Sequence, residues 1–185
     1  MSKRFFDVAV SAVLLLCLSP LMFLIALLIK TTSKGPIIFK QERIGLNNIP
    51  FIILKFRTME PGSDQSPDAV TKGDKRVTRV GVFFRSTHLD ELPQLVNVLK
   101  GEMSLVGPRP WRMCTMSLRH KEGSNLNQRH KVQPGITGPA QILGRTLTSE
   151  MVALSDLAYV EKHNLIGDLY IILQTIPIIF KRRGI

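Results

Sequence analysis

The feature that most constrains this chain is an uncharged, apolar run near its start, at residues 8–29. Only Ser11, Ser19 and Pro20 interrupt the run, and about 20 apolar residues are enough for a helix to cross a bilayer. A helix in the core of a soluble domain would keep a polar face. A cleaved signal peptide would have a shorter apolar region, followed by small residues at the cleavage site. The run therefore predicts a membrane element that stays in the protein.

Pro20 lies near the middle of this run and leaves open whether the helix crosses the membrane. A proline removes one backbone hydrogen bond and kinks a helix, and the hydroxyl of Ser19 could bond to a freed carbonyl. Basic residues flank both ends of the run: Lys3, Arg4, Lys30 and Lys34. The positive-inside rule then favours neither side. Two courses remain open, a kinked spanning helix and a hairpin that bends at Ser19-Pro20 and returns to the same face.

After residue 34 the chain has the mixed composition of a soluble domain. Turn residues, apolar periodicity and helix-ending signals predict the following elements: strands at 37–39 and 50–56, a turn at 45–48, a surface loop at 61–74, and helices at 89–100 and 149–163. The apolar segment 169–180 and the basic residues 181–183 fit either a helix in the membrane interface or a last core helix. Together these elements predict an α+β, mainly helical protein.

The charge balance narrows the choice of partners. The chain has 25 Lys and Arg residues against 14 Asp and Glu, a formal net charge of +11. Such a basic surface suits nucleic acid, an anionic membrane or a phosphate-bearing substrate. Aromatic residues are only 6% of the chain and are not interleaved with arginine and lysine, so nucleic acid is the least favoured. The two cysteines, Cys17 and Cys114, make no disulfide framework and favour a reducing compartment.

Asp90 and Glu91 are adjacent acids at the start of the first predicted helix after the strands. Thr87 or His88 could cap that helix, with Pro93 in its early turns. The helix N-terminus stabilises an ionised carboxylate, and such a carboxylate can attack phosphorus or bind Mg²⁺. Acids are also common in first helical turns for structural reasons alone. The pair by itself therefore leaves both interpretations open.

Several basic residues lie where the backbone restricts their motion. Arg109 stands between Pro108 and Pro110, whose fixed backbone would aim a guanidinium that matches phosphate oxygens. Lys55 and Arg57 alternate along a predicted strand and so leave it on the same face. Each cluster taken singly is also compatible with a solvated basic surface.

Other common site motifs are missing from the sequence. The four histidines show no metal-ligand spacing, and with two scattered cysteines they make zinc improbable. The sequence has no Walker loop, Gly-x-Gly-x-x-Gly run or Gly-x-Ser-x-Gly elbow. Residues 134–138, Pro-Gly-Ile-Thr-Gly, could turn backbone amides toward an anion.

Four motifs, taken in order, resemble those of the bacterial sugar transferases, the monotopic phosphoglycosyl transferases that begin glycan assembly on a polyprenyl carrier. The motifs are Lys-Phe-Arg-Thr-Met at 55–59, Leu-Asp-Glu-Leu-Pro-Gln at 89–94, Gly-Glu-Met-Ser-Leu-Val-Gly-Pro-Arg-Pro at 101–110, and Pro-Gly-Ile-Thr-Gly at 134–138. The resemblance covers nearly the whole chain, including the apolar N-terminal segment with its Ser-Pro. His88 and Pro139 depart from the usual pattern, but neither replaces a catalytic group.

The resemblance implies transfer of a sugar 1-phosphate from a UDP-sugar to undecaprenyl phosphate with release of UMP, the first membrane step of bacterial glycoconjugate assembly. It also implies a requirement for Mg²⁺. By the same resemblance Asp90 is the nucleophile, which forms an aspartyl-phosphosugar intermediate, and Glu91 assists at the metal or as a base. Substrate- and phosphate-binding roles fall on Lys55, Arg85, Arg109, Arg145 and Asp168.

The resemblance further implies a re-entrant anchor at residues 1–34, broken at Ser19-Pro20, and a catalytic domain at 35–185 with interfacial helices. That domain would lie on the cytoplasmic face of the bacterial inner membrane, and the chain would be a minimal catalytic unit without extra spans. Membrane lipid is an implied partner, and a homodimer and downstream glycosyltransferases are compatible with this arrangement. Two rivals are a non-catalytic basic adaptor on anionic lipid and a single-span protein with its domain outside the cell.

Overall fold

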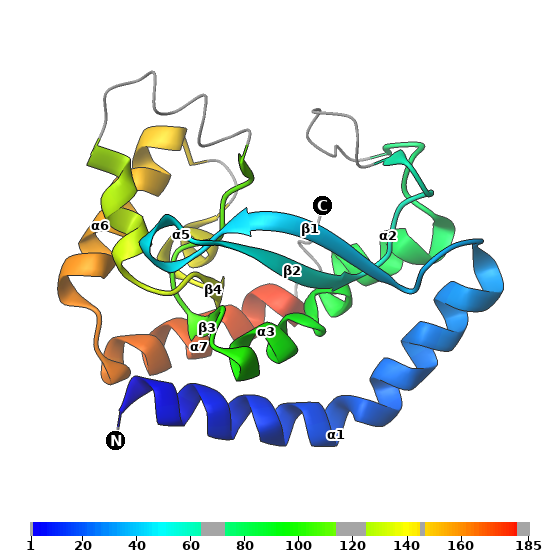
Figure 1. Ribbon diagram of the computed structural model, residues 1–185, viewed down its shortest axis with the longest axis horizontal. Coiled ribbons are helices and arrows are strands. Elements are labelled where there is room, and N and C mark those ends of the chain that lie inside the picture. The colour runs from blue at the N-terminus through cyan, green and yellow to red at the C-terminus, as the bar shows by residue number, and fades with distance from the viewer. Residues whose placement is uncertain (1, 64–72, 114–124, 145–146, 181–185) are drawn as a thin grey trace.

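The computed structural model describes residues 2–63, 73–113, 125–144 and 147–180. The long helix α1 (Lys3–Thr32) lies along one side of a small α+β domain (Figure 1). The strands are β1 (Ile38–Ile44), β2 (Pro50–Phe56), β3 (Ser104–Val106) and β4 (Gly135–Thr137). The other helices are α2 (Arg79–Ser86), α3 (Gln94–Lys100), α5 (Pro139–Leu143), α6 (Ser149–Lys162) and α7 (Leu165–Phe180). Short 3₁₀ turns are η1 (Leu46–Asn48), η3 (Leu89–Glu91) and η4 (Asn125–Lys131). The predicted mainly helical α+β class is confirmed.

Helix α1 bends near its middle, where Pro20 lies (Figure 1). A proline lacks the N–H that a helix needs and its ring clashes with the preceding turn, which is the usual cause of such a bend. The Ser19 hydroxyl donates a hydrogen bond to the Leu16 carbonyl at 2.8 Å. The expected break at Ser19-Pro20 is therefore a bend within one continuous helix of 30 residues.

Both halves of α1 pack against the same domain. Phe6 and Val10, in the first half, pack on a buried cluster that includes Val98 of α3. Ile25 and Ile29, in the second half, are 2% and 1% exposed and belong to a second cluster. The helix is therefore attached to the domain near its start and near its end.

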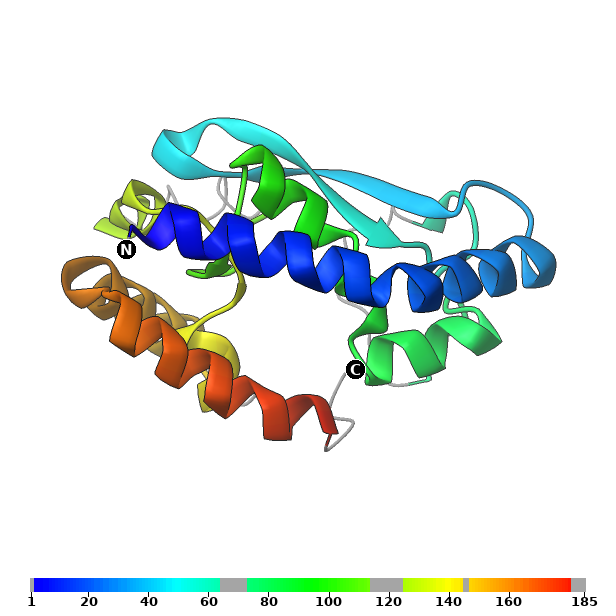
Figure 2. The same cartoon turned by 90° about the horizontal axis from the view of Figure 1, so that it is seen from below.

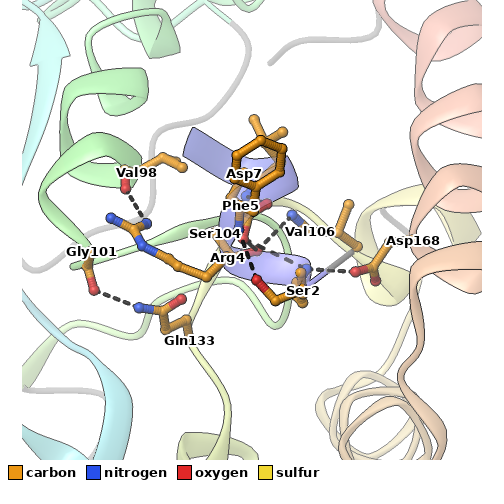
Figure 3. A network of polar contacts seen from close by, with 12 residues as sticks. Ser2, Arg4, Phe5, Asp7, Val98, Gly101, Ser104, Val106, Gln133 and Asp168 are labelled. Atoms are coloured by element: carbon orange, nitrogen blue, oxygen red, sulfur yellow. Dashed lines mark hydrogen bonds and ion pairs between the residues drawn. The ribbon is translucent and has the colours of Figure 1, made fainter. Parts of the chain in front are cut away.

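Polar contacts fix the start of α1 to the domain (Figure 3). The Arg4 guanidinium donates to the carbonyls of Val98 and Leu99 at the end of α3, at 2.6 and 2.9 Å. The buried carboxylate of Asp7 accepts from the Ser104 hydroxyl at 2.8 Å and from the Leu105 amide at 3.1 Å. A charge buried in an apolar helix is costly unless it is hydrogen-bonded, so these contacts explain how Asp7 is accommodated.

The underside of the molecule is formed by α1, α7 and α2 (Figure 2). In the most apolar 18-residue window of α1 only 11% of the residues are buried. Large apolar side chains are exposed on all three helices, including Leu16, Phe23, Leu24, Val82, Phe83, Ile166, Tyr170 and Leu173. Exposed apolar surface on this scale is typical of a face that contacts lipid or protein.

The two predicted strands and the turn between them are confirmed, but the first strand is longer than the predicted 37–39. β1 and β2 pair antiparallel, from Ile38 opposite Phe56 to Ile44 opposite Pro50. The connecting turn holds Asn47 and Asn48 at φ of 52° and 63°, a left-handed conformation that asparagine tolerates. Asn97 of α3 ties the hairpin to the helices, since its side chain donates to the Ile52 carbonyl and accepts from the Leu54 amide.

The helix predicted at 89–100 is wrong in its first part. Residues 89–91 form the 3₁₀ turn η3, and the α-helix begins only at Gln94, after Pro93. Proline supplies no N–H to continue the hydrogen bonding, so it separates the turn from the helix. The predicted end is confirmed, since Gly101 has the left-handed φ of 85° that favours glycine after a helix.

The later helices follow the prediction closely. Helix α6 has the predicted start and ends one residue early, and α7 begins at Leu165 rather than 169. Most of the predicted loop at 61–74 and all of the basic residues 181–183 lie outside the described residues.

Candidate active site

A cavity of about 810 Å³ opens between the β1–β2 hairpin, the η3 turn and the loop after β3. Its lining includes eight basic residues: Lys40, Arg43, Lys55, Arg57, Arg76, Arg85, Arg109 and Arg112. It includes three acidic ones, Glu60, Asp90 and Glu91. A concave site with this excess of positive charge favours an anionic ligand. Lys55 and Arg57 both line this cavity, although Arg57 follows the last residue of β2.

Glu91 is held by two of the cations. Its Oε1 accepts from the Lys55 ammonium at 2.5 Å and from the Arg109 guanidinium at 2.9 Å. Burial opposes ionisation of Glu91, but Arg109 and Lys55 outweigh it and hold its pKa well below the usual range. Burial in turn lowers the pKa of Lys55, although the charge of Glu91 opposes that change. Glu91 is therefore a fixed anion that keeps two cations at the cavity wall.

Asp90 has the opposite character, although it is the next residue. It is 7% exposed and lines the same cavity. No hydrogen bond or ion pair joins its carboxylate to any residue that the structure describes. Burial, and then the negative charge of Glu91, raises its pKa to about 6. Asp90 is therefore ionised at neutral pH while its oxygens remain uncommitted, which is the state that a carboxylate nucleophile needs.

The backbone before the pair is unusual. His88 has φ of 59° and ψ of 12°, in the left-handed region, and its side chain does not cap the η3 turn. The expected side-chain cap at Thr87 or His88 is therefore wrong for the turn that carries the acids, and the α-helix begins only after them, at Gln94. Such conformations concentrate at functional sites.

Arg109 is positioned by a residue that the sequence did not mark. The Arg129 guanidinium donates to the Arg109 carbonyl at 2.9 Å and forms a buried ion pair with Asp156 at 2.6 Å. It also stacks on the Trp111 ring, 3.9 Å from the ring centroid. No local pattern reveals Arg129, because its partners lie 20 and 27 residues away in the chain.

Strand β4 and the segment that follows β3 meet directly behind Arg109. The Gly107 amide donates to the Thr137 carbonyl at 2.9 Å, and the Gly135 amide donates to the Pro108 carbonyl at 3.0 Å. A Cβ at Gly107 would collide with the Gln133 carbonyl, so only glycine allows this approach. The expectation that residues 134–138 present amides to an anion is thus wrong for Gly135, because its amide already donates to the Pro108 carbonyl.

The structure brings Lys55, Arg85 and Arg109 to the cavity together with the two acids. It places Asp168 elsewhere, on α7, where its fully buried carboxylate accepts from Lys3 at 2.5 Å and from the Tyr159 hydroxyl at 2.7 Å. Figure 3 shows Asp168 beside the start of α1. There it joins α1, α6 and α7. Arg145 lies outside the described residues.

The carboxylates at the cavity are candidate ligands for magnesium. Within the described ranges no group of three or more His, Cys, Asp or Glu side chains could hold a metal ion. Mg²⁺ in phosphate-transfer sites is, however, commonly held by one or two carboxylates together with substrate phosphates and waters. Asp90 and Glu91 in a cationic cavity fit that donor set, provided that the ligand brings phosphate oxygens.

Comparison with known proteins gives a consistent result. The family model described as bacterial sugar transferase matches residues 1–182. A UDP-glucose:undecaprenyl-phosphate glucose-1-phosphate transferase of Klebsiella pneumoniae is 45% identical, over 94% of this chain and 39% of that protein. A protein of the same name from Caulobacter vibrioides is 43% identical, over 95% of this chain and 68% of its own length. A UDP-N-acetylgalactosamine-undecaprenyl-phosphate N-acetylgalactosaminephosphotransferase of Aeromonas hydrophila is 40% identical, over 98% of this chain and 44% of that protein. The chain thus spans less than half of two of these relatives.

Proposed function

Because this chain belongs to the bacterial sugar transferase family, we propose that it transfers a sugar 1-phosphate from a UDP-sugar to undecaprenyl phosphate and releases UMP. The observation that carries the proposal is the contrast between the two acids. Glu91 is committed to Lys55 and Arg109, whereas Asp90 is ionised, uncommitted and open to a cationic cavity. The names of the relatives support both substrates.

In the first step a carboxylate oxygen of Asp90 attacks the phosphorus that bears the sugar. The bond from that phosphorus to the bridging oxygen breaks, and UMP leaves with the bonding electrons. Asp90 then carries the phosphosugar as an acyl phosphate. An anion that approaches a diphosphate needs cations to offset the repulsion, and Lys55, Arg85 and Arg109 line the cavity for this purpose.

In the second step a phosphate oxygen of undecaprenyl phosphate attacks the same phosphorus. The bond to Asp90 breaks, the carboxylate is regenerated, and the lipid carries a diphosphosugar. If Mg²⁺ binds, Asp90 and Glu91 would hold it, and it would supply further positive charge to the reacting phosphates. Arg129 holds the backbone of Arg109 so that its guanidinium stays at Glu91 during both steps.

The membrane course that fits this chemistry is re-entrant, with the domain on the cytoplasmic face. The supporting observation is that α1 contacts the domain near both of its ends, through Arg4 near its start and Ser33 just after its end. A helix that crossed the bilayer would place its ends about 30 Å apart on opposite sides, and one soluble domain could not bind both. The exposed apolar side chains of α1, α2 and α7 would then face lipid.

The test is release of UMP from a panel of UDP-sugars by the protein in lipid nanodiscs, with Mg²⁺ and undecaprenyl phosphate. We expect release from one donor, dependence on the acceptor in the steady state, and no release by Asp90→Asn. Without acceptor, mass spectrometry should find the phosphosugar on the peptide that contains Asp90. Release of UDP instead of UMP, or an active Asp90→Asn variant, would refute the proposed chemistry.

A further inference from the structure

Arg57 is a buried guanidinium whose hydrogen-bonding capacity is only partly used. The residue is 6% exposed. Its Nη2 donates to the carbonyl and the hydroxyl of Ser33, at 3.0 and 2.7 Å. Its Nε and Nη1 have no hydrogen-bond partner, and no carboxylate pairs with it, among the residues that the structure describes. A guanidinium has five N–H donors, so three of them are buried without a partner.

The Ser33 contact explains only one of the three nitrogens. Ser33 is the residue after α1, where the helix leaves carbonyl groups without partners and carries a partial negative charge. An arginine at this position satisfies that helix end. Neither effect accounts for Nε or Nη1. A buried charge without a counter-ion is costly, so the remaining N–H groups indicate a partner other than the residues that the structure describes.

The place of Arg57 shows what that partner could be. Arg57 lines the same cavity as Asp90 and lies where α1 ends. Gly35 lies against its Nη1, and a Cβ at that glycine would overlap the guanidinium. Gly35 also has φ of +115°, which few other residues adopt. The backbone at Gly35 therefore packs closely against this nitrogen, and a side chain at that position would displace the guanidinium from its place at the cavity.

We propose that Arg57 binds a phosphate group of a substrate through its unpaired N–H groups. Guanidinium groups match phosphate oxygens in geometry and charge, and the interaction is strong where water is excluded. The inference rests on the proposed function, which supplies two phosphate sources, the lipid acceptor and the diphosphate of the donor. The position beside the end of the membrane helix favours the lipid phosphate.

The first test measures binding without turnover. The unfolding temperature of the protein in nanodiscs is followed against inorganic phosphate and against undecaprenyl phosphate, for wild type and Arg57→Lys. Ligand binding raises that temperature, and the increase gives an apparent Kd. We expect Arg57→Lys to weaken binding of inorganic phosphate, undecaprenyl phosphate or both about tenfold, since an ammonium cannot reproduce the planar fork of a guanidinium.

Two control variants separate phosphate binding from the attachment of α1. Ser33→Ala removes one hydrogen bond of Arg57, and Arg4→Lys disturbs the other attachment of α1, away from the cavity. Both should lower the unfolding temperature of the free protein yet bind phosphate as wild type does. Unchanged phosphate binding in Arg57→Lys, or an equal loss in the two controls, would overturn the inference.

The second test identifies the source of the phosphate. If Arg57 binds the lipid phosphate, Arg57→Lys raises the KM for undecaprenyl phosphate about tenfold and leaves UMP release in the absence of acceptor unchanged. If Arg57 instead binds the diphosphate of the donor, Arg57→Lys lowers UMP release in the absence of acceptor and leaves the KM for undecaprenyl phosphate unchanged. Normal values for both would overturn the inference. Should wild type release no UMP from any donor, the proposed function fails, whereas the binding result for inorganic phosphate still stands.

Discussion

Replacing Asp90 with asparagine should stabilise this protein while it abolishes turnover. Asp90 is buried, and its pKa in the folded protein is about 6, above the value of 3.8 for an exposed aspartate. The folded state therefore holds the proton more tightly than the unfolded state does. Stability falls as pH rises from about 4 to 6, and the full penalty is present at neutral and alkaline pH.

The magnitude follows from the two pKa values. The difference between 3.8 and about 6 corresponds to about 3 kcal/mol, at about 1.36 kcal/mol for each pKa unit. Asparagine resembles the neutral form, so Asp90→Asn should recover up to about 3 kcal/mol at pH 8. For a chain of this length that is an increase of about 6 to 12 °C in the unfolding temperature.

Glu91→Gln is the matched control. Glu91 is adjacent in sequence, but Arg109 and Lys55 hold its pKa well below the usual range, so its ionised form stabilises the fold. Removing that charge leaves the ammonium of Lys55, only 16% exposed, without its partner. We expect this variant to lose stability at pH 8, by about 1 to 3 kcal/mol.

The assay is thermal unfolding of both variants and wild type in nanodiscs, at pH 8 and at pH 4. The advantage of Asp90→Asn over wild type should shrink to below about 1 kcal/mol at pH 4, where most of the penalty on wild type is gone. An unfolding temperature at or below wild type at pH 8 would refute the reasoning. So would an advantage that does not change with pH, since it could not come from ionisation of Asp90.

Four further results are expected. UMP release without acceptor should fall below about pH 6, as the Asp90 carboxylate becomes protonated, in a stopped-flow pH profile. Arg129→Lys should lower kcat more than it raises the donor KM, because it frees the Arg109 backbone without touching substrate. Asp168→Asn should lower the unfolding temperature but leave the donor KM unchanged; a raised KM would restore it as a binding residue. Cysteines at positions 2 and 34, in a cysteine-free background, should both react with an impermeant reagent from the cytoplasmic side only.

The parts of the site that the sequence predicts are those with a local cause. The apolar run at 50–56 places Lys55 in a strand, and two prolines mark Arg109 as a fixed side chain. The glycine at 101 ends a helix because a left-handed conformation is needed there. Each of these signals depends on residues within a few positions of one another, so no knowledge of the tertiary structure is required.

The parts that the sequence does not predict depend on distant contacts. The opposite character of Asp90 and Glu91 comes from burial and from Lys55, which is 36 residues before Glu91. Arg129 and Asp156 meet only in the folded protein. Pro93 is visible in the sequence, but whether a proline enters a helix or ends a turn is decided by packing around it. Asp168 joins Lys3, 165 residues away, and no pattern in either segment shows this pairing.

The buried carboxylate of Asp7 has a consequence for how the protein is made. Asp7 leaves the ribosome 97 residues before Ser104, which hydrogen-bonds to it. At about 5 to 20 residues per second, synthesis takes roughly 5 to 20 s to supply that partner. During this interval the Asp7 carboxylate lacks that partner, and water must solvate it. Biogenesis therefore includes a period in which the start of the helix stays at an aqueous surface, and folding of the domain completes its attachment.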